Sequence, residues 1–227
     1  MNRRSALRLA LIGIVLLVVG VVGGTWLYIN VIKEDAPAPL AAPSPPAQGA
    51  TGVADASSFA GTWTIAEGSV ARYRVQEILF GQRSLAVGET RGVEGSLTVV
   101  GSTLQSGEFS VDMTTVTSPE SRRDNQFRTR IMETDRYPTA SFKLTQPVQL
   151  TAGQGQKAVE ITGDLTLHGT TRSVTFTATS TVVDPGVDVT GTIPVVFADY
   201  NIANPSGGPA QTEDHGILEF SLKFARS

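Results

Sequence analysis

The chain contains no cysteine, and His168 and His215 are the only histidines among its 227 residues. The absence of cysteine excludes disulfide bonds, thiol catalysis and a lipid-modified cysteine anchor, so an exported domain would depend on its core alone for stability. Two histidines, without a thiol and without HExxH or similar spacing, do not supply the ligand set of a zinc site. We interpret His168 as a turn residue that bonds to the local backbone.

The sequence also lacks the common motifs of catalysis. It has no GxSxG nucleophile elbow and no phosphate-binding glycine loop. Its aspartates and glutamates are scattered, and no pair of carboxylates stands out for acid–base chemistry. We therefore expect a protein that is not an enzyme and that has no catalytic residues, metal or cofactor.

The first 35 residues form a separate segment. Arg3, Arg4 and Arg8 precede Leu9–Ile32, a run of 24 residues without a charged side chain. A membrane-spanning helix needs about 20 apolar residues, whereas a cleavable secretory signal has a shorter apolar region. We therefore predict a single uncleaved transmembrane helix in preference to a cleaved signal. Because arginines flanking a span stay in the cytoplasm, the N-terminus should lie inside the cytoplasmic membrane and the rest of the chain outside it.

Residues 36–58 are rich in alanine, proline, glycine and serine, a composition typical of an extended linker. Residues 59–227 are long enough for one folded domain. The first 35 residues carry four of the 18 basic and two of the 21 acidic side chains, which leaves 14 basic and 19 acidic. The resulting net charge of about −5 argues against nucleic acid as a partner.

Apolar and polar residues alternate in about eight segments of residues 59–227, and this period of two predicts β-strands with one apolar face. The clearest case is ITGDLTLHGTTRSVTF at residues 161–176, which predicts a hairpin with its turn at His168–Thr171. Another is the stretch from Leu218 to Phe224. About eight such strands fit either a closed antiparallel barrel or a sandwich.

One helix should interrupt the strands. Ser118 is suited to the N-cap and Pro119 to the first helical position. Phe127, Ile131 and Met132 follow on one face at helical spacing.

Three glycines occupy positions in the apolar parity of their strands. Gly95 lies between Val93 and Leu97, and Gly163 and Gly191 have similar settings. One interpretation is that the missing side chains leave room inside a barrel for an elongated apolar ligand. The other is that the glycines mark bends or bulges where the strands curve.

Four stretches together resemble the YceI-like family of lipid-binding, lipocalin-like barrels. They are SRRDNQF at 121–127, YPTASF at 137–142, TGDLTLHGTTR at 162–172 and ADYNI at 198–202. The resemblance covers the chain from about Thr62 to its end. It implies a mainly β fold, an eight-stranded antiparallel lipocalin-like barrel with one capping helix, here preceded by the predicted transmembrane helix. It also implies export and the binding of a polyisoprenoid or isoprenoid quinone inside the barrel.

We therefore expect a membrane-anchored, extracytoplasmic protein that binds a long apolar lipid. An alternative is a ligand-free scaffold or adhesion module displayed off the membrane, and a weaker one is an enzyme that processes a lipid. The helix residues should cap the ligand and strand residues should line its site. The predicted ligand-binding residues are Tyr73, Leu97, Phe109, Val111, Phe127, Ile131, Met132, Phe142, Leu165 and Phe176.

Overall fold

The computed structural model describes residues 14, 16–24, 37–40, 59–151, 156–183, 186–208 and 210–227. The chain divides into two compact units, Met1–Ala36 and Pro37–Ser227. In the first unit, residues 14 and 16–24 are helical. None of the described helices is both long enough and apolar enough to cross a membrane. The predicted span Leu9–Ile32 lies largely outside the described residues, so the transmembrane helix stays a prediction, as does the division of the chain into residues 1–35, 36–58 and 59–227.

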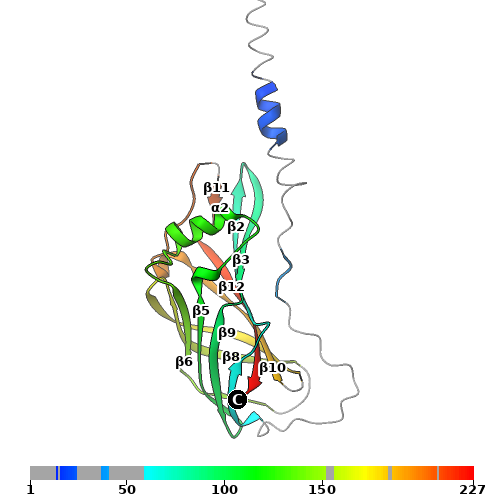
Figure 1. Ribbon diagram of the computed structural model, residues 1–227, viewed down its shortest axis with the longest axis vertical. Helices are drawn as coiled ribbons and strands as arrows, with labels where there is room; N and C mark the ends of the chain where they lie inside the picture. Colours follow the sequence, from blue (N-terminus) through cyan, green and yellow to red (C-terminus); the bar gives the residue numbers. More distant parts are fainter. Residues whose placement is uncertain are drawn as a thin grey trace, which may run out of the picture. The chain divides into compact units, whose positions relative to one another are not determined.

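In its described residues the second unit contains twelve strands joined in one sheet (Figure 1). The strands are β1 (Gly61–Ile65), β2 (Val70–Leu79), β3 (Gln82–Thr90), β4 (Val93–Val100), β5 (Thr103–Asp112), β6 (Thr139–Leu144), β7 (Val148–Gln149), β8 (Gln156–Leu167), β9 (Thr170–Val183), β10 (Gly186–Val196), β11 (Ala210–Thr212) and β12 (His215–Arg226). Three short helical segments connect them: η3 (Met113–Thr115), α2 (Ser121–Gln126) with η4 (Phe127–Ile131), and η5 (Phe197–Tyr200).

Eight strands close into a ring in the order β1, β4, β5, β6, β8, β9, β10 and β12, and β12 pairs again with β1. The pairings around the ring are antiparallel. Strand β12 also pairs with β2 over Ile217–Ser221, so β2 and its partner β3 continue the wall beyond β1. The structure confirms the predicted eight-stranded barrel and excludes the sandwich that alternation alone left open.

The predicted hairpin is β8 followed by β9. The strands pair from Gln156 with Thr181 down to Leu167 with Thr170. The turn is therefore only two residues long, His168 and Gly169, which both have positive φ, 48° and 71°. Two successive positive φ angles are typical of the type I′ turn that matches the twist of paired strands.

Helix α2 begins later than predicted and continues into the π-helical turn η4. Ser118 does not cap it, because Ser118 donates hydrogen bonds from its backbone N–H (2.8 Å) and its hydroxyl (2.6 Å) to Oδ1 of Asp124. These bonds hold the residues before Ser121 outside the helix. Phe127 and Met132 are buried, whereas Ile131 is half-buried. The helix lies near the ends of β2 and β11, at one end of the barrel (Figure 1).

Candidate functional site: an apolar cavity inside the barrel

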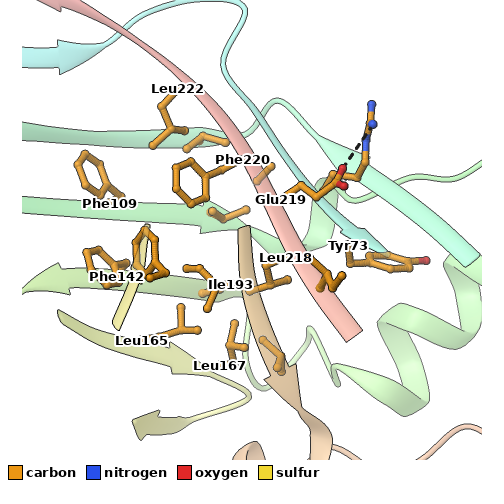
Figure 2. Close-up of a pocket in the computed structure, with 18 of the residues that line it drawn as sticks. Tyr73, Phe109, Phe142, Leu165, Leu167, Ile193, Leu218, Glu219, Phe220 and Leu222 are labelled. Atoms are coloured by element: carbon orange, nitrogen blue, oxygen red, sulfur yellow. Dashed lines mark ion pairs between the residues drawn. The ribbon is translucent and has the colours of Figure 1, made fainter. Parts of the chain in front are cut away.

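The barrel encloses an apolar cavity of about 420 Å³, within the usual size range of ligand sites. Inward-facing side chains from the strands of the ring line it (Figure 2). Lys157 and Leu167 both line it although they are ten residues apart on β8, which corresponds to about 33 Å of strand. Because barrel strands tilt by about 40°, the cavity extends over about 25 Å of the barrel axis. The cavity is therefore long and narrow.

All ten residues nominated from the sequence line this cavity, although contact with a ligand remains a prediction for each of them. Other inward-facing residues of β8, β10 and β12 line it as well and were not nominated. They are Leu167, Ile193, Val195, Leu218, Phe220 and Leu222. The alternation of these strands could have found them, since every second residue of a barrel strand faces the interior.

The three inward glycines do not leave empty space above their backbones. A Cβ atom added at Gly191 would lie 2.5 Å from Cζ of Phe220, its cross-strand partner. One added at Gly95 would lie 2.7 Å from Cδ1 of its partner Phe109. At Gly163 an added Cβ would overlap the ring of Phe142 on the neighbouring strand.

Each glycine thus lets an aromatic ring from the adjacent strand lie flat against the barrel wall. A fourth case was not predicted, in which the Tyr73 ring lies over Gly88, its partner on β3. Rings that lie on the wall do not fill the centre of the barrel. Both interpretations of the glycines were therefore incomplete. The space above each glycine is occupied by an aromatic ring, and it is the position of these rings that leaves the cavity open. Backbone also approaches two of these glycines closely, because an added Cβ would overlap the carbonyl oxygen of Glu108 at Gly95 and that of Lys143 at Gly163. Gly95 has, in addition, a φ of 149°, which side chains rarely adopt, so a backbone bend contributes there.

Tyr73 and Phe127 close the cavity on the side of α2. Their rings stack with centroids 5.2 Å apart and planes within 7° of parallel. Burial raises the pKa of Tyr73 to about 12, against the opposing effect of the nearby Arg123 guanidinium. The phenol therefore keeps its proton near neutral pH. Its hydroxyl points away from the apolar side chains (Figure 2).

Charged side chains lie at both ends of the cavity. Arg123 Nη2 and Glu77 Oε1 form an ion pair of 3.0 Å, and both residues line the cavity at the α2 end. Lys157 lines the opposite end, and no carboxylate in the described ranges pairs with it. An apolar tunnel with polar groups at its ends suits an amphipathic, elongated molecule.

His168 connects the β8–β9 turn to two distant segments. Its Nε2 lies 2.9 Å from Oε2 of Glu133, and its Nδ1 lies 3.4 Å from the carbonyl oxygen of Tyr200. Its ring meets the Tyr137 ring edge-on at 4.5 Å. His168 is a turn residue, as predicted, but the prediction that it bonds to the local backbone is wrong. The residues that the structure describes contain no group of three or more metal-ligating side chains, and the absence of a metal stays a prediction.

Residues 58–224 match the family model of the YceI-like domain. The chain belongs to the YceI-like family. A UPF0312 protein of Pseudomonas putida strain W619 is 31% identical to this YceI-like chain over 147 residues, which cover 60% of the chain and 73% of that protein. A UPF0312 protein of strain GB-1 is 30% identical over the same length.

Solved structures share the YceI-like fold. One is a polyisoprenoid-binding domain from Saccharophagus degradans, implicated in plant cell wall breakdown, with a TM-score of 0.59 and 14% identity. The match covers 73% of this chain and 98% of that domain. Another is BcnA from Burkholderia cenocepacia, with a TM-score of 0.53 and 16% identity over 66% of this chain and 95% of BcnA. At such identities the similarity establishes the fold alone.

Proposed function

We propose that this YceI-like chain is a membrane-anchored, extracytoplasmic protein that binds a long apolar lipid inside its barrel and catalyses no reaction on it. The observation that carries the proposal is the elongated apolar cavity of about 420 Å³. A barrel that served only as a scaffold or adhesion module could be filled by its own side chains. A cavity of this length favours a ligand over that alternative.

The ligand that we propose is a polyisoprenoid or an isoprenoid quinone. One protein of the same fold is described as a polyisoprenoid-binding domain, which supports this class. The cavity wall also carries a row of aromatic rings, since Phe176 lies 5.5 Å from Phe142 and 5.7 Å from Phe220, both edge-on. Such a wall offers apolar surface along the whole of a single chain. Each methylene buried there contributes about 0.8 kcal/mol.

The polar end of the lipid should lie at the α2 end of the cavity. Burial of the ring raises the pKa of Tyr73 to about 12, so its hydroxyl stays protonated and can donate a hydrogen bond at this end. The Glu77–Arg123 pair beside it is neutral overall. This environment favours a neutral acceptor, such as a quinone carbonyl or a prenol oxygen, over a phosphate group.

Membrane attachment rests on the sequence of the first unit. The charge-free run Leu9–Ile32 follows three arginines, which supports a single span with the N-terminus in the cytoplasm. The barrel then lies outside the cytoplasmic membrane, next to a source of isoprenoid lipids.

Native mass spectrometry of full-length protein, released from membranes into mild detergent and loaded with quinones or prenols of several lengths, tests the ligand. Ala178→Leu adds volume at a position that faces the cavity, whereas Thr179→Leu places the same leucine side chain on the other face of β9. We expect bound lipid in the parent and in Thr179→Leu and less in Ala178→Leu, with unfolding midpoints measured for all three. Protein that is empty on purification and takes up no lipid of any length would refute the proposal.

A further inference from the structure

The outer face of the wall formed by β12, β2 and β3 is covered, although strand alternation places it towards solvent. Strand alternation places Glu219 on the opposite face from the inward-facing Leu218 and Phe220, although its side chain also borders the cavity (Figure 2), and Val87 lies between the cavity-lining Ala86 and Gly88. Both outward-facing residues are nevertheless only 4% exposed. A carboxylate buried to this degree requires compensating partners.

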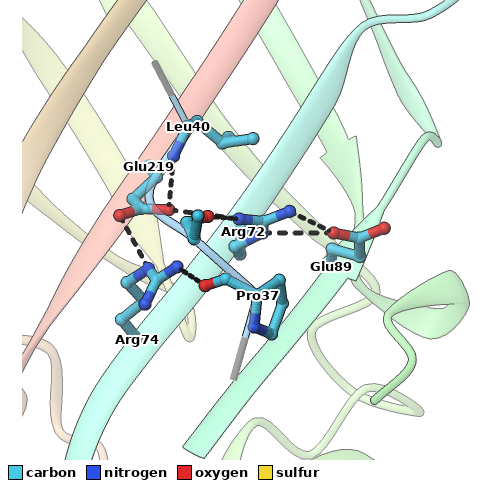
Figure 3. Close-up of polar contacts among 7 residues, drawn as sticks. Pro37, Leu40, Arg72, Arg74, Glu89 and Glu219 are labelled. Carbon is cyan, nitrogen blue, oxygen red and sulfur yellow. Dashed lines mark hydrogen bonds and ion pairs between the residues drawn. The ribbon is translucent and has the colours of Figure 1, made fainter. Parts of the chain in front are cut away.

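Two arginines of β2 supply the partners of Glu219. Arg74 Nε lies 2.8 Å from Oε1 of Glu219, and Arg72 Nη1 lies 3.7 Å from its Oε2 (Figure 3). Arg72 also pairs with Glu89 of β3 at 2.7 Å. Arg72 and Arg74 are two residues apart, so the period of two puts both guanidinium groups on the same outer face. The two arginines and the carboxylates of Glu89 and Glu219 are neutral overall, but several guanidinium N–H groups remain free to donate to other acceptors.

Those donors are used by the segment Pro37–Leu40, which crosses this face (Figure 3). Arg74 Nη2 donates to the carbonyl oxygen of Pro37. Arg72 Nη1 donates to the carbonyl oxygen of Ala38 at 2.8 Å. In return, the backbone N–H of Leu40 donates to Oε2 of Glu219 at 3.4 Å. All three bonds involve the backbone of the segment and none involves its side chains.

The composition of the segment suits this mode of binding. Proline fixes φ near the value of an extended chain, so Pro37 and Pro39 reduce the conformational freedom that is lost on docking. Proline also lacks an N–H, but this costs no hydrogen bond here, because Leu40 is the residue whose N–H donates to the wall. A proline-rich stretch that would otherwise serve only as a spacer is thus pre-shaped for the arginine pair.

We propose that the outer wall around Arg72, Arg74 and Glu219 is a docking site for extended, proline-containing backbone, and that its occupant is the chain's own segment Pro37–Leu40. The docking itself does not depend on the proposed function. Its consequence for the length of the membrane tether does, because that argument rests on the proposed membrane anchor. In an anchored chain, residues 33–36 alone would connect the end of the apolar run at Ile32 to the docked segment. Four residues reach about 14 Å, against about 90 Å for the 26 residues from Lys33 to Ser58. Docking therefore makes the tether short.

Paired spin labels on the full-length protein in lipid nanodiscs test the docking, and the absence of native cysteine lets labels be placed freely. Ala38→Cys with Lys143→Cys measures the distance from the segment to the exposed face of β6. Gln76→Cys with Lys143→Cys measures the barrel alone. Each pair is combined with one of three variants. Leu40→Pro removes the N–H donated to Glu219, and Leu40→Ala keeps it. Arg74→Lys replaces the guanidinium, which contacts both Glu219 and the Pro37 carbonyl, by a point charge.

We expect one narrow 38–143 distance in the parent and in Leu40→Ala, and a broad distribution in Leu40→Pro and Arg74→Lys. The 76–143 distance should stay narrow in all four proteins, which shows that the barrel is intact. A broad 38–143 distribution in the parent, or identical narrow distributions in Leu40→Pro and Leu40→Ala, would overturn the docking. Docking that persists in a protein found not to be membrane-anchored would leave the site in place and remove only the tether argument.

Discussion

Replacing Gly191 by alanine tests whether flat-lying rings keep the cavity open. An added Cβ would lie 2.5 Å from Cζ, 3.0 Å from Cε1 and 3.2 Å from Cε2 of Phe220. Carbon atoms in favourable contact are about 3.5–4.0 Å apart, so the ring must move by about 1 Å or turn off the wall. Gly191 has no positive φ, and alanine therefore adds steric conflict without backbone strain.

The expected loss of stability is about 1–3 kcal/mol, the usual effect of one extra carbon in a packed position. A ring that turns off the wall enters the cavity, because Phe220 already lines it. Gly191→Ala should therefore lower lipid occupancy as well as the free energy of unfolding. Denaturant unfolding and native mass spectrometry on the same samples measure the two effects.

The double variant Gly191→Ala/Phe220→Leu provides the control. If the conflict is between these two side chains, the second change should relieve it, with a coupling energy of about 1 kcal/mol or more. A Gly191→Ala protein within about 0.5 kcal/mol of the parent and with full lipid occupancy would refute the flat-ring explanation. Strict additivity of the two changes would refute it equally.

Three further predictions concern the phenol, the cap and the anchor. The Tyr73 phenol ionises near pH 10 when unfolded and near 12 when folded, so its contribution to stability is complete below pH 10 and is lost as the pH rises to 12. Between pH 10 and 12 the free energy of unfolding of the parent should therefore decrease more steeply than that of Tyr73→Phe, by about 1.4 kcal/mol per pH unit. Equal slopes for the two proteins would contradict the assignment. Ile131→Asp, at a half-buried position of the cap, should weaken quinone or prenol binding while the barrel stays folded, whereas Met132→Asp, at a buried position, should mainly lower the melting temperature. If Ile131→Asp lowers the melting temperature as much and leaves binding unchanged, the cap has no role in the site. The full-length protein should stay in the membrane fraction at high salt and alkaline pH, and a mature N-terminus within residues 36–58 would show that the apolar run is cleaved.

The interior of the barrel was predictable because one rule governs it. Alternation with a period of two assigns every second residue of a strand to one face, and a closed barrel turns all those faces inward. Leu97, Phe109 and Leu165 were identified as cavity residues on that rule, and the structure places them there. The rule needs no knowledge of which strands are neighbours.

Features that depend on neighbouring strands could not be predicted in the same way. That Phe220 lies over Gly191 follows from the register of β10 against β12, which alternation in one strand does not fix. The start of α2 was misplaced because Ser118 has two possible roles, capping a helix or bonding to Asp124, and the second prevails. The partners of His168 lie 35 and 32 residues away in the sequence.

The outer wall of β12, β2 and β3 was the least predictable part of the structure. The stability of the barrel does not account for its buried charges. Strand alternation alone puts Glu219 on the outer face of β12, and the backbone group of Leu40 that donates to it lies 179 residues earlier in the sequence. Buried ion pairs add little net stability, and well-packed apolar residues in their place are often neutral or stabilising. A barrel that needed only a stable wall would therefore gain little from Arg72, Arg74 and Glu219. Apolar side chains could not donate to two carbonyl oxygens and accept one N–H at fixed spacing, as these three residues do. The charges are better explained by the segment that they hold than by the stability of the barrel.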